Sequence, residues 1–128
     1  MKISEWRTRN PTCIQEGEPL HHAHRLMRAR RVRHLPVLHG EELVGVVSER
    51  DLYLLETLRG VDLGKEPVSE AMTEDPYAVA PEAKVRDVVR EMLRKKYGSA
   101  IVLQGTKVAG IFTRGDALRV LETVLRTG

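Results

Sequence analysis

Aromatic residues and cysteine are scarce in this chain of 128 residues. It contains one Trp, one Phe, three Tyr and a single cysteine, Cys13. One cysteine excludes an intramolecular disulfide and a cysteine-based zinc site, so we expect Cys13 to act as a small buried apolar residue. The few aromatic residues leave few platforms on which single-stranded nucleic acid could stack.

Long apolar runs and a secretory signal are also missing. The longest uncharged apolar stretches, such as residues 43–48, are far shorter than the roughly 20 residues that span a membrane. The N-terminal segment M-K-I-S-E-W-R-T-R-N-P lacks the apolar core of a signal peptide. We therefore expect a cytoplasmic protein that makes no membrane contact.

The charge is nearly balanced, with 21 basic and 18 acidic residues and a net charge of +3. This allows an anionic ligand but does not by itself indicate nucleic acid. Five arginines lie in the nine residues from Arg25 to Arg33, with no acidic residue among them. This cluster could be a solvated helix face, a phosphate-facing group, or a patch for nucleic acid or an acidic partner.

A seven-residue motif occurs twice in the chain. Residues 45–51 read G-V-V-S-E-R-D and residues 110–116 read G-I-F-T-R-G-D, an offset of 65 residues. The same offset continues backwards through many pairs, including Gly40 and Gly105, Met27 and Met92, and Pro11 and Pro76. Such a constant register indicates an internal repeat. We predict repeats at about 3–60 and 68–125, joined by a linker at 61–67.

Each repeat has the pattern of a β-α-β-β-α unit, which predicts a mixed α/β (α+β) fold. In the second repeat, apolar residues at positions 85, 88, 89, 92 and 93 follow the helical period. Pairs of β-rich runs joined by a short turn with glycine predict hairpins. The expected strands are 12–14, 35–38 and 43–47, and then 77–79, 100–103 and 108–112.

Each heptapeptide lies where a strand passes into a helix. Ser48 with Asp51, and Thr113 with Asp116, have nearly the spacing of a capping box. The same place suits a phosphate, because a helix N-terminus offers unpaired N–H groups. A carboxylate there can accept both hydroxyls of a ribose. The position of these residues in the sequence does not distinguish a helix cap from a ligand-binding site.

Taken together, these motifs resemble a known family. The x-h-P-V-h strand at 34–38, the glycine turn and the G-h-h-[S/T]-x-x-D motif, repeated in order over about residues 3–125, look like a stand-alone pair of CBS (cystathionine β-synthase) domains. The resemblance implies repeats that pack with pseudo-twofold symmetry, and often a homodimer. It also implies regulatory binding of AMP, ADP, ATP or S-adenosylmethionine in clefts between repeats.

The resemblance also assigns roles to residues. In the family's pattern, the motif aspartate holds the ribose, the Ser or Thr contacts ribose or phosphate, the first short strand faces the adenine, and basic residues reach the phosphates. In repeat 1 these are Asp51, Ser48, Ile14 with Cys13, and Arg33, His34 and Arg50. In repeat 2 they are Asp116, Thr113, and Val79 with Ala78.

Repeat 2 departs from this pattern where the cations should be. Gly98 and Ser99 replace Arg33 and His34, and Gly115 replaces Arg50. We therefore expect repeat 1 to be the one that holds a phosphate. The repeat 2 site would bind an uncharged adenosine moiety, bind weakly or be empty, unless cations come from the facing repeat or another subunit.

No nucleophile–base pair, phosphate loop or catalytic carboxylate dyad is evident, so we expect neither an enzyme nor a catalytic cofactor. His21 and His24 could share a helix face. No Cys, Asp or Glu at a suitable spacing completes a set of metal ligands with them, so we expect no metal site. The sequence thus favours a sensor of adenosine nucleotides that regulates an unknown protein. The alternatives are a dimeric scaffold with vestigial sites and, less favoured, a nucleic-acid-binding module that uses the cluster from Arg25 to Arg33.

Overall fold

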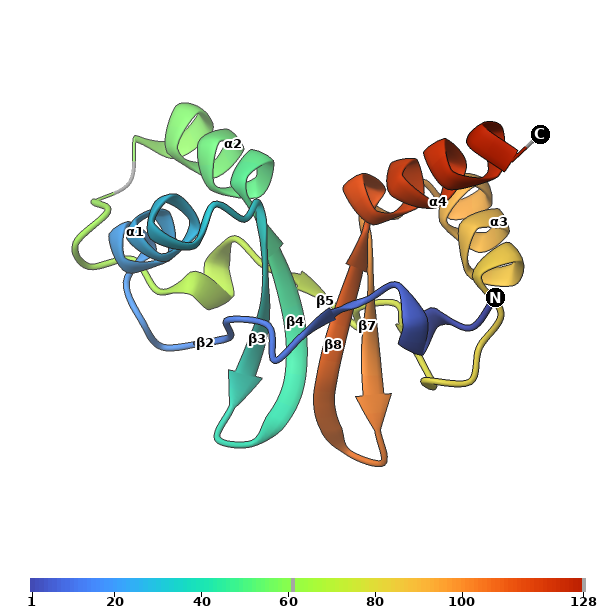
Figure 1. The fold of residues 1–128 in the computed structure, drawn as a ribbon. Coiled ribbons are helices and arrows are strands. Elements are labelled where there is room, and N and C mark those ends of the chain that lie inside the picture. The colour runs from blue at the N-terminus through green and yellow to red at the C-terminus, as the bar shows by residue number, and fades with distance from the viewer. Residues whose placement is uncertain (61, 128) are drawn as a thin grey trace. The chain divides into compact units, whose positions relative to one another are not determined.

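Two compact units make up the chain in its computed structural model (Figure 1). The structure describes residues 1–60 and 62–127, so residue 61 of the predicted linker 61–67 lies outside the described residues. The first-repeat unit comprises residues 12–76, and the second-repeat unit comprises residues 1–11 and 77–128. Each unit contains one four-stranded sheet.

The first-repeat unit has the sheet order β2-β3-β4-β5. β2 runs parallel to β3, while the β3–β4 and β4–β5 pairs are antiparallel. Within the unit, α1 and α2 lie together beside the β3–β4 hairpin (Figure 1). The elements are β2 (Ile14–Gln15), α1 (Leu20–Arg30), β3 (His34–His39), β4 (Glu42–Ser48), α2 (Glu49–Arg59), a 3-10 helix (Val68–Glu70) and β5 (Thr73–Glu74).

The second-repeat unit repeats this plan with the sheet order β1-β8-β7-β6. β6 is parallel to β7, and the other pairs are antiparallel. The elements are a 3-10 helix (Ile3–Glu5), β1 (Thr8–Arg9), β6 (Ala78–Val79), α3 (Val85–Lys95), β7 (Ser99–Gln104), β8 (Lys107–Thr113) and α4 (Arg114–Thr127). The predicted mixed fold with two β-α-β-β-α repeats is therefore confirmed.

The short strands β1 and β5 were not expected from the sequence. β1 pairs with β8, Thr8 opposite Ile111, and β5 pairs with β4, Thr73 opposite Val46. The lead-in of each sequence repeat thus completes the sheet built mainly from the other repeat. The compact units consequently have different boundaries from the sequence repeats at 3–60 and 68–125.

The repeat extends to the backbone conformation. Of the seven described residues with φ between 45° and 64°, all but Gly60 form pairs separated by the same 65 positions: Asn10 and Asp75, Arg31 and Lys96, and Gly40 and Gly105. Asn and Asp tolerate this left-handed region better than most residues do. Arg31 and Lys96 end α1 and α3, where a left-handed residue commonly stops a helix.

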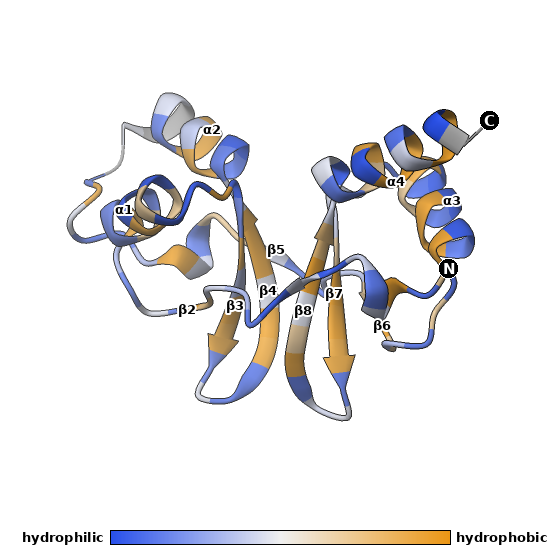
Figure 2. Cartoon of the chain, in the orientation of Figure 1, coloured by the Kyte–Doolittle hydropathy of each residue, from blue (hydrophilic) through white to orange (hydrophobic). Residues whose placement is uncertain are grey.

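Each unit has its own hydrophobic core. In the first-repeat unit, the central strands contribute Leu35, Val37 and Val47, which pack with Met27 of α1 and Leu52 of α2. The other core is built in the same way, and its buried members include Val88, Met92, Val102, Phe112 and Val120. The hydrophobic colouring of β3, β4, β7 and β8 follows this division (Figure 2). These cores fix the junctions where β4 meets α2 and β8 meets α4.

Gly45 provides a test of the β4–β5 pairing. A Cβ at this position would lie 2.7 Å from Met72 Sδ and 2.8 Å from the backbone oxygen of Thr73. Because that oxygen belongs to β5, it cannot move aside without disturbing the sheet. We expect Gly45→Ala to lower the free energy of unfolding by about 1–3 kcal/mol, measured by denaturant titration.

Gly17→Ala is the matched control, since no atom lies within 4 Å of its added Cβ. It should cause no loss of stability. Equal stability of the two variants would contradict the close approach of β4 and β5.

Candidate ligand-binding site

The motif of repeat 1 forms a capping box at the start of α2. The Asp51 backbone N–H donates to Ser48 Oγ at 3.0 Å, and the Ser48 backbone N–H donates to Asp51 Oδ2 at 2.9 Å. The cap considered from the sequence is therefore present. Among the described residues, no donor bonds to Asp51 Oδ1. The cap thus fixes the carboxylate and leaves one of its oxygens for another partner.

The expected basic residues lie beside this cap. The register of the β3–β4 hairpin places His34 opposite Ser48. The Glu49 N–H, at the first position of α2, donates to the Arg33 backbone oxygen at 2.9 Å. Arg33 and Arg50 are exposed, and His34 is half-buried. The fold therefore brings Arg33, His34 and Arg50 to the N-terminal end of a helix, where the helix dipole also favours an anion.

The predicted adenine-facing residues lie on the neighbouring strand. Ile14 in β2 pairs with Val37 of β3, three residues along that strand from His34. Its side chain is 4% exposed and belongs to the core, so only its backbone is placed to meet a ligand edge. Cys13 precedes it and is half-buried, and this burial raises the pKa of its thiol.

The motif of repeat 2 has a different hydrogen-bond pattern. Asp116 Oδ2 accepts from the Thr113 backbone N–H at 2.8 Å and from Thr113 Oγ1 at 3.3 Å. Asp116 Oδ1 accepts from Arg119 Nη2 at 2.5 Å. Asp116 is also buried, with 6% of its surface exposed. Both oxygens of this carboxylate therefore already have donors within the chain.

The remaining repeat 2 residues occupy places equivalent to those in repeat 1. Ala78 and Val79 in β6 pair with β7, where Val79 is half-buried and Ala78 is exposed. Comparison of the two motifs missed Arg119, because Leu54 lies at the matching position of repeat 1. The available signal was its spacing: residues i and i+3 of a helix are neighbours, and Arg119 is three residues after Asp116.

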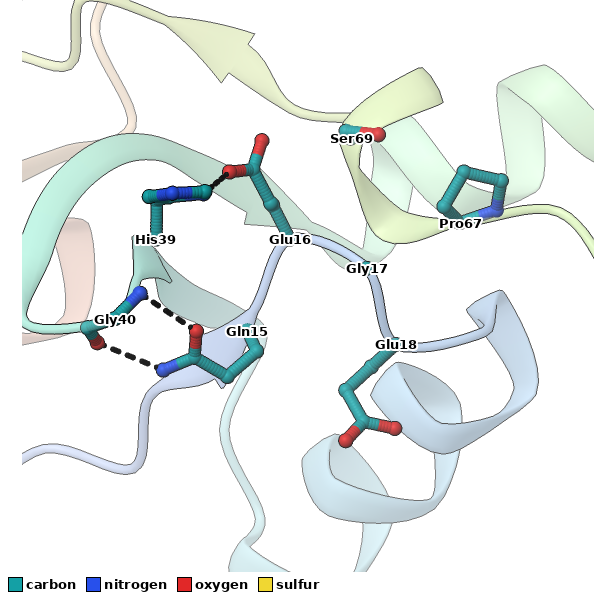
Figure 3. Close-up of a pocket in the computed structure, with 8 residues that line it drawn as sticks. All are labelled: Gln15, Glu16, Gly17, Glu18, His39, Gly40, Pro67 and Ser69. Atoms are coloured by element: carbon teal, nitrogen blue, oxygen red, sulfur yellow. Dashed lines mark hydrogen bonds and ion pairs between the residues drawn. The ribbon is translucent and has the colours of Figure 1, made fainter.

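A shallow depression of about 760 Å³ lies elsewhere on the first-repeat unit (Figure 3). At its edge the Gln15 side-chain amide donates to the Gly40 oxygen at 2.8 Å and accepts from the Gly40 N–H at 2.9 Å. His39 is paired with Glu16 beside it. None of the predicted ligand residues lines this depression, which adjoins the end of β3 opposite to His34.

The histidines of α1 have separate partners. His21 Nδ1 lies 3.1 Å from the Leu63 oxygen, and His24 is paired with Glu56 of α2. Within the described ranges, no three His, Cys, Asp or Glu side chains come together as a metal site would require. The helices that the structure describes include none with the length and apolar character needed to cross a bilayer.

Comparison with known proteins identifies the family. The CBS-domain family model matches residues 3–55 and 68–123, which together cover most of the chain. The protein belongs to the CBS-domain family and carries two such domains in tandem, as its sequence predicted.

Two sequence relatives differ greatly in length. The uncharacterized protein YlbB of Bacillus subtilis is 35% identical over 107 residues, which cover 80% of this chain and 70% of that protein. Inosine-5'-monophosphate dehydrogenase of Korarchaeum cryptofilum is 31% identical over 109 residues, 84% of this chain but only 22% of the enzyme. A match to so small a part of an enzyme is no evidence of catalysis.

Two solved structures have the same fold. CBSX2 in complex with AMP has a TM-score of 0.83 and 27% identity, with 96% of this chain and 97% of that chain covered. The CBS domain pair of protein MJ0100 was solved with 5'-methylthioadenosine and S-adenosyl-L-methionine. It has a TM-score of 0.87 and 18% identity, with 96% and 97% of the two chains covered. At this lower identity the second match shows the fold alone.

The raised pKa of Cys13 predicts slow alkylation. Burial disfavours the thiolate, so less of the thiol is ionised at a given pH in the folded protein than in the unfolded chain. We expect the rate of iodoacetamide alkylation to rise at a higher pH for the folded protein than for the same protein in urea. Since Cys13 is the single cysteine, the unfolded chain is its own control. Superimposable pH profiles would contradict the burial of the thiol.

Proposed function

We propose that this protein is a regulatory module that binds a phosphate-bearing adenosine nucleotide at the β4–α2 junction, with the ribose held by Asp51. The observation that carries this proposal is that Asp51 Oδ1 has no donor among the described residues, at the helix end where the Arg33 backbone oxygen accepts from the Glu49 N–H. The AMP complex of CBSX2 supports the ligand class.

The geometry suits each part of such a ligand. A ribose diol presents two hydroxyl donors, and the Asp51 carboxylate is an acceptor held in place by the Ser48 N–H. Charge-assisted bonds of this kind are stronger than those between neutral groups. The backbone of Ile14, on the neighbouring strand, is available to the adenine edge.

The charges favour a phosphate over S-adenosylmethionine. Arg33 and Arg50 are exposed near the positive end of α2, and His34, which follows Arg33, is the first residue of β3. S-adenosylmethionine has one carboxylate, but its sulfonium and ammonium groups leave it with a net positive charge, which these arginines disfavour relative to a phosphate. AMP, ADP and ATP place anionic phosphates at the same position. The choice among these three rests on the number of phosphates that the arginines can reach.

Self-association is a second property that a specific feature supports. Leu118, Leu121 and Leu125 follow one face of α4 and are 64%, 49% and 68% exposed. Apolar rows of this kind mark interaction sites, which supports the proposed homodimer and the scaffold role considered as an alternative. The regulated partner and a cytoplasmic location remain predictions from the sequence.

A thermal-shift titration with AMP tests the proposal. A ligand at 100 times its Kd stabilises the folded state by about 2.7 kcal/mol, which raises the Tm by several degrees. Asp51→Asn keeps an acceptor for the Ser48 N–H but removes the charge. We expect this variant to lose at most about 1 kcal/mol of stability without ligand, because a first-turn charge is removed, and to lose most of the AMP-dependent rise in Tm.

Glu42→Gln removes the same charge at the opposite end of β4 and should keep the full shift. The absence of any shift in the wild type with AMP, ADP or ATP would favour the scaffold role. An equal loss of the shift in both variants would show that net charge, rather than Asp51, determines binding.

A further inference from the structure

Arg119 occupies the carboxylate that repeat 2 would offer to a ribose. Its Nη2 donates to Asp116 Oδ1 at 2.5 Å and also to the Trp6 backbone oxygen at 3.2 Å. The guanidinium is thereby held both by the first turn of α4 and by the N-terminal segment of the same unit. With Thr113 bonded to Oδ2, the Asp116 carboxylate has donors on both oxygens.

Repeat 1 lacks this arrangement because of one side chain. Leu54 lies at the position that matches Arg119, and it is 55% exposed and has no donor. Both junctions otherwise share the same backbone bond, from the Ser48 or Thr113 N–H to Oδ2 of the motif aspartate. We call the β4–α2 junction with Asp51 and the β8–α4 junction with Asp116 the two half-sites. They therefore differ in whether Oδ1 of the aspartate already accepts a hydrogen bond from a side chain of the same helix.

We propose that Arg119 closes the repeat 2 half-site, so that each chain binds one adenosine nucleotide, at Asp51, and none at Asp116. The inference rests on the proposed function and names the residue that restricts it to one repeat. An incoming ribose would have to replace an ion pair, in which both partners are charged, with hydroxyl bonds in which only the carboxylate is charged.

The strength of this closure follows from the burial of its two ends. The Asp116 side chain is 8% exposed and that of Arg119 is 61% exposed. Because the Arg119 guanidinium is exposed, solvent weakens its ion pair with Asp116, so the pair can open. The buried carboxylate keeps a strong preference for a charged donor. We therefore expect no AMP at Asp116 at concentrations that saturate Asp51.

Isothermal titration of the full chain with AMP tests the inference through its stoichiometry. The wild type should bind one AMP per chain. Arg119→Leu, which installs the repeat 1 residue, should bind two, the second more weakly because repeat 2 lacks the counterparts of Arg33, His34 and Arg50, and adding Asp116→Asn should return the count to one. Arg119→Gln serves as a second variant if the leucine destabilises the fold, and it should also bind two.

Arg126→Leu is the matched control. Arg126 lies on the same helix, is 70% exposed and pairs with Glu122 at 3.2 Å, so the variant removes the same charge and a similar ion pair. It should still bind one AMP per chain.

Three results would overturn the inference: two AMP per chain in the wild type, one in both Arg119 variants, or weaker binding after Arg119 is replaced, which would make Arg119 a ligand contact. The proposed function is tested separately, by loss of the wild-type site in Asp51→Asn. If the wild type binds no AMP but Arg119→Leu gains a site that needs Asp116, the closure by Arg119 stands, while binding at Asp51 and the proposed function fail. If no variant binds AMP, both are overturned.

Discussion

The hydrogen bond from a strand-end N–H to the carboxylate three residues later determines how each junction is built. In repeat 1 it joins Ser48 to Asp51, and in repeat 2 it joins Thr113 to Asp116. The bond caps the following helix and, at the same time, holds the carboxylate at one place relative to the sheet. A residue that serves folding in this way is also preorganised for binding, because little side-chain entropy remains to be lost.

Two copies of one motif can thus have different uses. Asp51 keeps an oxygen without a donor among the described residues and has arginines nearby, whereas Asp116 is buried and bonded to Arg119. The duplicated fold explains why both aspartates are present, since each caps a helix. Their surroundings, set by single residues such as Leu54 and Arg119, determine what else each carboxylate can do.

Much of the fold could be predicted because the repeat compares the chain with itself. The helix at Val85–Lys95 has a clear apolar stripe, and its partner at Leu20–Arg30 could be identified from the constant offset despite a weaker one. The strands Thr8–Arg9 and Thr73–Glu74 escaped prediction, since two-residue strands carry no periodicity and their pairing partners are distant in sequence. The available signal was that both strands lie at the same spacing before Asn10-Pro11 and Asp75-Pro76.

The candidate site was predictable to a similar degree. The register of β3 with β4 brings His34 beside Ser48, because a hairpin fixes which residues face each other. The bond between Arg119 and Asp116 was missed, because alignment of the repeats draws attention to shared residues and away from a residue present in only one. The depression beside Gln15 and Gly40 was not expected either, since it arises from the hairpin turn and from Pro67 and Ser69, which are distant in sequence.

The central claim is that the two junctions are unequal and that the one at Asp51 receives the nucleotide. The most direct measurement is an NMR titration of the ¹⁵N-labelled protein with AMP, which follows every backbone amide. We predict the largest shifts at Ile14, Ser48 and Asp51, with small changes at Thr113 and Asp116. Equal shifts at both junctions, or shifts centred on Gln15 and Gly40, would contradict it.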